Sequence, residues 1–288
     1  RRLFELLPQG QPSILNIDDP HGSILVDSVE RPVTYALQNE AAVTCGSVEG
    51  SLTGLRFDVR TPRGEVRVRS ALIGQANVYN ILAAVATGVA LDVSFSAIET
   101  GIAAVTAVPG RFEIVSAATD EVTVVIDFAH TDDALRLLLE SARPLASGRL
   151  ITVFGCGGDR DRSKRPLMGA VAARLSDLVV VTSDNPRSED PAAIIEDTVA
   201  GIDTRYAGQE GNRDSVPGGG QQTPFVTIVD RSAAISHAVG EARRGDVVII
   251  AGKGHETYQV VAGETVPFND AAVARTALTQ RRSNSRVS

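Results

Sequence analysis

Short apolar runs alternate with longer segments of helical periodicity through the second half of the chain. The runs are rich in Val, Ile and Leu, and the segments between them carry apolar residues at helical spacing. The pattern predicts strands at 122–127, 149–154, 178–182, 225–229 and 247–251, and helices at 132–146, 164–176, 191–202 and 231–243. Strands that alternate with helices form right-handed βαβ units, so a mostly parallel sheet is expected. A hairpin, 257–261 with 264–267, and a helix from Asp270 follow.

The first third of the chain has a different pattern. Runs at 13–17, 33–37 and 65–69 are β-like and separated by Gly and Pro, which predicts strands. Helices are expected at 77–91 and 94–105, the second capped by Ser94. Pro109 and Gly110 then interrupt the pattern.

These patterns divide the chain into regions. We expect one domain at 1–108 and a second at 109–280. Within the second, residues 207–224 are poor in apolar side chains and rich in Gly, which predicts a mobile surface excursion. Residues 281–288 are expected to be a disordered tail.

Composition narrows the class of protein. The 288 residues are 43% hydrophobic, enough for one large core or two ordinary ones. The formal charge of -7 and the pI near 5.2 argue against a protein that binds nucleic acid or an anionic membrane. Cys45 and Cys156 lack metal-ligand spacing, which fits a reducing compartment. No long apolar run or signal-peptide pattern occurs, so we expect a cytoplasmic location without membrane association.

Polar motifs follow four of the predicted strands. They are DFAH at 127–130, GCGGDR at 155–160, TSDNPR at 182–187 and GKGHE at 252–256. The carboxyl ends of parallel strands form the edge where such sheets bind ligands. The four motifs therefore predict a cleft that holds both signs of charge.

Each motif also has a purely structural interpretation, and for DFAH it is a helix cap formed by Asp127 and His130. The glycine loop at 155–158 is neither G-x-G-x-x-G nor a Walker loop, and it could serve only a tight turn. Residues 184–187 could cap the next helix, and Glu256 could be a surface residue. Against this, the Arg187 guanidinium suits bidentate carboxylate binding, and Glu256 follows a strongly apolar strand, where it could hold an ammonium. A Rossmann-like nucleotide-binding module and a non-catalytic amino-acid-binding domain both stay open as functions.

Taken together, IDFAHTDDAL, FGCGGDRDRSKRPLMG, TSDNPR and AGKGHETYQ resemble the later half of a Mur ligase, a family of ATP-dependent, amide-forming enzymes of peptidoglycan synthesis. The resemblance extends from about Asn16 to Leu278. It implies an α/β fold, with the later half of the central ATPase domain followed by a Rossmann-like C-terminal domain with a mostly parallel sheet. The family's UDP-sugar domain, P-loop and carbamylated lysine would lie upstream of Arg1. The chain is therefore expected to be a fragment without catalytic residues of its own and without ligase activity alone.

The resemblance also assigns binding residues. The distal carboxylate of meso-diaminopimelate would be bound by Arg160, Asn185 and Arg187, and its distal ammonium by Gly252 and Glu256, while Asp184 would support the turn. The nucleotide would be contacted by Asn77, Asn80, Arg111, Asp127 and His130. The sequence departs from the family pattern near the nucleotide, at Ala76, Phe128 and Asp132.

The implied reaction follows from the same resemblance. In this family the DNPR motif marks the members that add meso-diaminopimelate rather than lysine. The γ-phosphate of ATP would pass to the D-glutamate carboxylate of UDP-N-acetylmuramoyl-L-alanyl-D-glutamate, and the diaminopimelate amine would then attack the acyl phosphate. ATP and Mg²⁺ are the implied cofactors, with the metal ligands unknown, and a monomer is expected.

Overall fold

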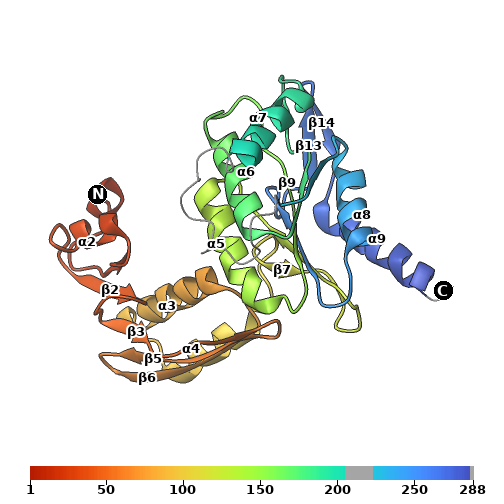
Figure 1. Ribbon diagram of the computed structural model, residues 1–288. Coiled ribbons are helices and arrows are strands. Elements are labelled where there is room, and N and C mark those ends of the chain that lie inside the picture. Colours follow the sequence, from red (N-terminus) through yellow and green to blue (C-terminus); the bar gives the residue numbers. More distant parts are fainter. Residues whose placement is uncertain (205–222, 286–288) are drawn as a thin grey trace, which may run out of the picture. The chain divides into compact units, whose positions relative to one another are not determined.

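The computed structural model describes residues 1–204 and 223–285. The chain divides into two compact units, Arg1–Ala107 and Val108–Ser288. The first is drawn in red to yellow and the second in yellow-green to blue (Figure 1). The division lies next to Pro109 and Gly110, the pair that interrupts the sequence pattern.

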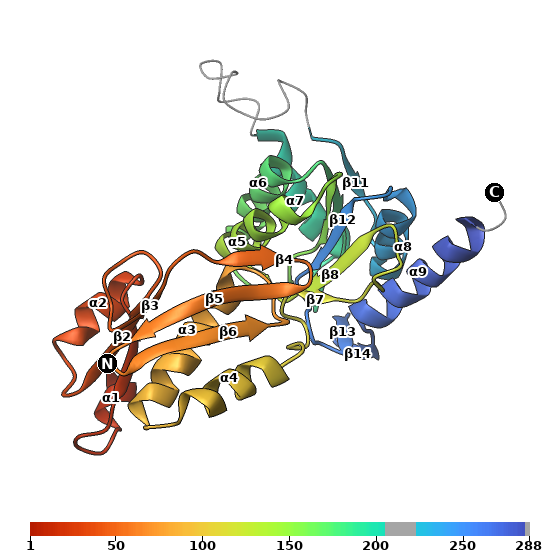
Figure 2. The ribbon, with the colours of Figure 1, turned by 90° about the horizontal axis from the view of Figure 1, so that it is seen from below.

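The first unit, all of whose residues are described, contains a mixed sheet. The strand order is β1-β2-β3-β5-β4, with β6 paired to β5, and β1, β2 and β3 are parallel while the other pairs are antiparallel. Figure 2 shows the long strands β5 and β6 side by side. The strands are β1 (Ser13–Asn16), β2 (Pro32–Ala36), β3 (Val43–Cys45), β4 (Glu49–Ser51), β5 (Gly54–Thr61) and β6 (Gly64–Ser70). The helices are α1 (Arg2–Glu5), α2 (Pro20–Val26), α3 (Gln75–Ala90) and α4 (Phe95–Ala104).

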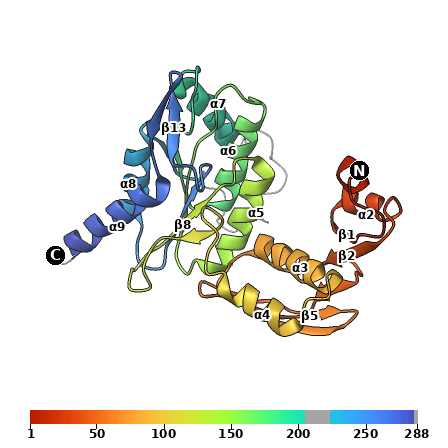
Figure 3. The same cartoon turned by 180° about the vertical axis from the view of Figure 1, so that it is seen from behind.

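Helices α3 and α4 pack against this sheet (Figure 3). In β6 the buried Val66 and Val68 alternate with exposed Glu65 and Arg67, the period of two expected for a strand with one buried face. Their partners across the core include Ile81, Leu82 and Val85 of α3 and Ile98 of α4. Ser94 Oγ accepts a hydrogen bond from the backbone N–H of Ala97, so the predicted cap of α4 is confirmed.

The second unit has the predicted mostly parallel sheet, with helices on both faces. Among its described residues the strand order is β11-β10-β9-β12-β8-β7, parallel except for β7. Figure 1 shows α5, α6 and α7 on one side of the sheet and α8 and α9 on the other. The strands are β7 (Glu113–Ile114), β8 (Thr123–Asp127), β9 (Leu150–Phe154), β10 (Leu178–Val181), β11 (Phe225–Thr227) and β12 (Val247–Ala251), with a separate hairpin of β13 (Tyr258–Val261) and β14 (Glu264–Pro267). The helices are α5 (Asp132–Ala142), α6 (Lys164–Leu175), α7 (Pro191–Thr204), α8 (Arg231–Glu241) and α9 (Asp270–Ser285).

Strand β12 lies between β8 and β9, which creates a switch point in the sheet. The chain runs outward from β9 through β10 to β11 and then returns to the other side of β9 as β12. Parallel sheets bind ligands at the carboxyl ends of the strands beside such a switch. The loops that follow β9, β10 and β12 carry three of the four predicted motifs, so the topology places them at this edge.

Some predicted boundaries were wrong. The helix predicted for 132–146 ends at Ala142 and continues as a 3₁₀ turn, η1 (Arg143–Leu145), because Pro144 has no backbone N–H for an α-helical bond. The short helices α1 and α2 and the strands β3, β4, β5 and β7 were not predicted. Of the excursion predicted at 207–224, all but Thr223 and Pro224 lie outside the described residues.

The predicted disordered tail is also corrected. Residues 281–285 continue helix α9. The helix is held here because Arg282 pairs with Asp120, Nη2 to Oδ2 at 2.7 Å, and Arg281 donates to the carbonyls of Val239 and Gly240. In the part of the chain that the structure describes, no helix has the length and apolar character needed to cross a membrane.

Candidate functional site

The loops after β9 and β10 are in direct backbone contact. The N–H of Gly158 donates to the carbonyl of Asn185 at 2.9 Å. A Cβ at Gly158 would lie 1.9 Å from the carbonyl oxygen of Pro186, and one at Gly155 would lie 2.3 Å from that of Thr182. Only glycine lets the two loops approach this closely. The packing favours the structural interpretation of the glycine loop.

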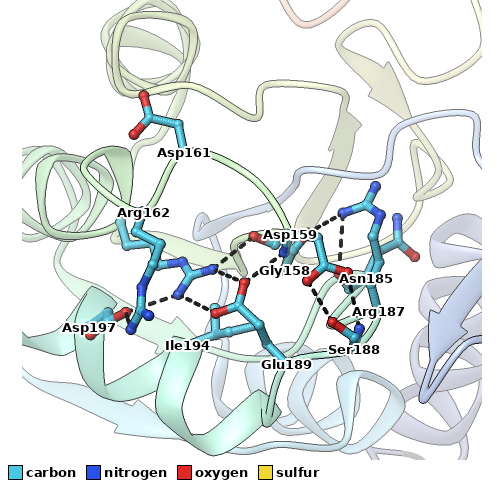
Figure 4. A network of polar contacts seen from close by, with 12 residues as sticks. Gly158, Asp159, Asp161, Arg162, Asn185, Arg187, Ser188, Glu189, Ile194 and Asp197 are labelled. Atoms are coloured by element: carbon cyan, nitrogen blue, oxygen red, sulfur yellow. Dashed lines mark hydrogen bonds and ion pairs between the residues drawn. The ribbon is translucent and has the colours of Figure 1, made fainter.

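Arg187 and Arg160 supply the positive charge of the site. The backbone N–H of Arg187 donates to the carbonyl of Val260 on β13, which holds the turn at a φ of 54°. Its Nη1 donates to the carbonyls of Gly158 at 2.7 Å and Asn185 at 3.5 Å (Figure 4). Within residues 1–204 and 223–285, neither arginine pairs with a carboxylate, and Arg160 is exposed. Both guanidinium groups can therefore accept an external carboxylate.

The negative charge of the site is the carboxylate of Glu256, which the buried Lys253 holds in place. Its ammonium is fully buried and donates to Glu256 Oε2 and Asn185 Oδ1, both at 3.0 Å. Asn185 Nδ2 donates to the same Glu256 oxygen at 3.0 Å. Burial alone would raise the pKa of the Glu256 carboxyl, but the hydrogen bonds from Lys253 and Asn185 outweigh it and hold the pKa below its usual value. Glu256 is thus a carboxylate with one oxygen already engaged.

Asp184 and Gly252 join the two halves. Asp184 Oδ1 lies 3.4 Å from Lys253 Nζ, and its carbonyl accepts from the side chain of Gln259 on the hairpin. Burial raises the pKa of the Asp184 carboxyl, against the opposing effect of Arg231 and Lys253. At Gly252, where φ is 114°, a Cβ would lie 2.7 Å from Asp184 Oδ2. The six residues predicted to bind the amino acid all lie on the loops after β9, β10 and β12.

Three of the predicted nucleotide residues lie in the second unit, near the end of β8. The Arg111 guanidinium lies 4.6 Å from the ring centre of Phe128, and the His130 ring meets the same ring edge to face at 4.6 Å. Asp127 accepts from the backbone N–H groups of Phe112 and Ala129, each at 2.8 Å. Burial raises the pKa of Asp127 although these bonds and Arg111 oppose it. Arg111 and His130 are exposed, whereas each oxygen of Asp127 already accepts one bond.

The other two nucleotide residues lie in the first unit, on helix α3. Asn77 is buried and donates to the carbonyl of Ile73 at 2.7 Å, and Asn80 Nδ2 donates to Asn77 Oδ1 at 3.2 Å. Asn77 therefore helps to fix the start of the helix, and Asn80 is the more exposed of the two.

Sequence reasoning missed two buried cations beside the predicted site. Lys253 lies inside the GKGHE motif, and Arg165 follows the glycine loop, yet the sequence analysis predicts neither as a site residue. Arg165 is 1% exposed and binds Glu189 and Asp197. The one available signal for Lys253 was its position two residues after the end of the apolar strand β12.

Two family models match the chain. The Mur ligase middle domain matches residues 1–88, and the glutamate ligase domain of Mur ligases matches residues 110–254. The chain belongs to the Mur ligase family. The predicted family membership and α/β fold are therefore confirmed.

Curated relatives of this Mur ligase chain include two proteins named UDP-N-acetylmuramoyl-L-alanyl-D-glutamate–2,6-diaminopimelate ligase. The protein from Gloeobacter violaceus is 46% identical over 94% of the chain, and that from Solibacter usitatus is 47% identical over 92%. The alignments cover 52% and 51% of those proteins. The chain thus spans about half the length of the curated relatives it matches.

Solved structures of ligases are also similar to this chain. A structure of UDP-N-acetylmuramoyl-L-alanyl-D-glutamate–2,6-diaminopimelate ligase is 34% identical and superimposes with a TM-score of 0.60, covering 94% of this chain and 54% of that one. A ligase from Thermotoga maritima solved with ADP, at 13% identity and a TM-score of 0.64 over 95% of this chain and 54% of that one, shares the fold alone.

The described residues do not assemble a metal site of the usual kind. No group of three or more His, Cys, Asp or Glu lies close enough among them to hold a metal ion. Mg²⁺ commonly takes only one or two carboxylates together with substrate phosphates, so no Mg²⁺ ligand is assigned among the described residues.

Proposed function

We propose that this chain supplies the amino-acid-binding part of an ATP-dependent ligase that adds meso-diaminopimelate to UDP-N-acetylmuramoyl-L-alanyl-D-glutamate. The observation that carries the proposal is the pairing of opposite charges on adjacent loops. Arg187 has a guanidinium that forms no ion pair with a carboxylate of the described residues, and Glu256 is an ionised carboxylate within its electrostatic reach. The names of the relatives at 46% and 47% identity support the same substrate.

The two charges match the distal end of diaminopimelate. That end carries a carboxylate and an ammonium on one carbon, whereas lysine carries the ammonium alone. Arg187 and the exposed Arg160 would bind the carboxylate, while Glu256 would use its remaining acceptor capacity for the ammonium. Asn185 touches Glu256 and also joins the backbone of Val260, so it would fix their orientation.

The site would act by orientation. ATP would transfer its γ-phosphate to the D-glutamate carboxylate and leave as ADP, because a free carboxylate is a poor electrophile. The other amine of diaminopimelate, after losing a proton, would attack the acyl carbon, and phosphate would leave. Holding the amine in place can lower such a barrier by several kcal/mol. Arg111, stacked on Phe128, and His130 would contact the nucleotide, and we propose that the enzyme works as a cytoplasmic monomer.

The test uses the full-length enzyme, meaning this chain joined to the other half that its relatives carry. It should release phosphate from ATP only when both the UDP-linked dipeptide and meso-diaminopimelate are present. Lysine should give a kcat/KM about 10³-fold lower, since it would leave both arginines without their partner. The 288-residue chain alone is the control and should form no amide, because it contains no Walker loop. Equal use of lysine, or binding of a nicotinamide cofactor instead, would reject the proposal.

The Glu256→Ala substitution should weaken both amino acids, because both carry the distal ammonium. A single charged hydrogen bond of this kind contributes roughly 1.5–3 kcal/mol, so kcat/KM should fall by about 10- to 100-fold for diaminopimelate and for lysine alike. Steady-state kinetics with each amino acid measure the two losses. A loss confined to diaminopimelate would show that Glu256 acts through the distal carboxylate and not through the ammonium.

A further inference from the structure

A buried arginine fixes the end of the DNPR turn. Arg165, at the start of α6, is 1% exposed and holds Glu189 through two bonds, Nη2 to Oε1 at 2.7 Å and Nη1 to Oε2 at 3.0 Å. The hydrogen bonds from Arg165 lower the pKa of Glu189 to about 2, so the carboxylate is ionised at neutral pH. Glu189 lies two residues after Arg187. Because the buried Arg165 binds both oxygens of Glu189, it fixes the position of this carboxylate.

From this position Glu189 reaches across to the glycine loop. Its Oε1 accepts the backbone N–H of Asp159 at 2.6 Å. In the other direction, the carboxylate of Asp159 accepts hydrogen bonds from Ser188 Oγ at 2.7 Å and from the Ser188 N–H at 3.2 Å (Figure 4). These reciprocal bonds tie the residue that precedes Arg160 to the residues that follow Arg187.

These bonds hold the backbone next to Arg160 and Arg187, the two arginines that would bind the distal carboxylate and that together form the proposed carboxylate clamp. Asp159 and Arg187 both have positive φ, 53° and 54°, which is uncommon for residues other than glycine. Such backbone persists where the surrounding contacts determine it. In Figure 4 Arg187 and Ser188 lie on one side of Asp159, while Arg162 and Asp197 lie on the far side of Glu189.

We propose that Glu189, held by Arg165, is a positioning residue that sets the separation of Arg160 and Arg187 and thereby the preference of the site for an amino acid with a distal carboxylate. The inference rests on the proposed function. Glu189 itself touches no substrate. It fixes the backbone from which each guanidinium extends, so both can reach the two oxygens of one carboxylate.

The experiment measures the ratio of kcat/KM for meso-diaminopimelate to that for lysine in the full-length enzyme. Glu189→Ala removes the tie and should raise KM for diaminopimelate roughly tenfold, with kcat and the lysine values little changed. Ser188→Ala removes one hydrogen bond at an exposed side chain and should raise that KM about threefold to fivefold. Glu189→Gln keeps an acceptor for the Asp159 N–H and should restore part of the loss.

Arg162→Ala is the matched control. It breaks an ion pair of the same network, Arg162 Nη2 to Asp197 Oδ2 at 2.9 Å, without touching Asp159 or Ser188. This variant should keep the substrate ratio of the unmodified enzyme. If Glu189 served folding alone, its variants would lower the melting temperature and impair both substrates equally. If Glu189→Ala does not fold, the substrate ratio of Ser188→Ala distinguishes a positioning role from a folding role.

Arg187→Ala separates the two proposals. If Arg187→Ala leaves the substrate ratio unchanged, the carboxylate clamp itself is wrong and the proposed function fails. If Arg187→Ala abolishes the preference while Glu189→Ala and Ser188→Ala leave it intact, the clamp stands and the positioning role of Glu189 is refuted.

Discussion

Replacing Arg187 by alanine should lower kcat/KM for meso-diaminopimelate by roughly 2–4 kcal/mol while changing that for lysine little. The guanidinium has no carboxylate partner within the described residues, so in the complex it is free to bind the distal carboxylate. Lysine lacks this group, and the substitution removes the penalty of leaving the arginine unpaired as well as the attraction. Discrimination between the two amino acids should therefore collapse. Steady-state kinetics of the full-length enzyme with each amino acid measure it.

The backbone at this position requires a second variant. Arg187 has a φ of 54°, a conformation in which alanine is strained and asparagine is favoured. Arg187→Asn should therefore give the same kinetic loss with less effect on stability. Arg136→Ala is the control, since among the described residues Arg136 pairs with Asp133 and Glu140 of its own helix and with no other carboxylate. Equal losses for both amino acids in Arg187→Ala and Arg187→Asn would show that the residue supports the turn and not the carboxylate.

The sequence predicted the second unit better than the first because the central strands of its sheet are buried on both faces. Strands β9 and β12 are buried at every position, so they read as continuous apolar runs. Strands β3, β4 and β7 have only two or three residues, too few to show a period. Helix α2 buries no residue and therefore leaves no apolar stripe in the sequence. Strand β5 is the exception, because it was not predicted although its buried Leu55, Phe57 and Val59 alternate with exposed residues.

Local sequence motifs predicted some residues of the site but not those whose burial depends on partners far away in the chain. Arg187 and Glu256 are predicted because their side chains suit a carboxylate and an ammonium and because the family resemblance assigns them these roles. Lys253 was missed because lysine is usually exposed, and its burial depends on partners 68 and 69 residues earlier in the chain. Arg165 was missed for the same reason, with Glu189 lying 24 residues away. Such contacts follow from the topology of the sheet, which brings the ends of β9, β10 and β12 together.

A fully buried ion pair beneath the site gives the largest expected effect on stability. Arg231 begins α8 and Asp270 begins α9, both side chains are 0% exposed, and two bonds of 2.8 Å join them. Arg231 Nη2 also donates to the carbonyl of Ala251 at 2.9 Å, at the end of β12. The pair thus links both helices to the strand that leads into Gly252.

Asp270→Ala should destabilise the second unit by about 3–5 kcal/mol, because it leaves the Arg231 charge buried without its partner. Thermal and urea unfolding of the 288-residue chain measure the loss. Glu121→Ala is the matched control, since it breaks an exposed pair with Arg244 and should cost no more than about 1 kcal/mol. The double variant Arg231→Met with Asp270→Leu removes both charges together and should recover most of the stability. If Asp270→Ala costs no more than Glu121→Ala, or if the double variant recovers nothing, the unpaired charge is not the cause of the loss.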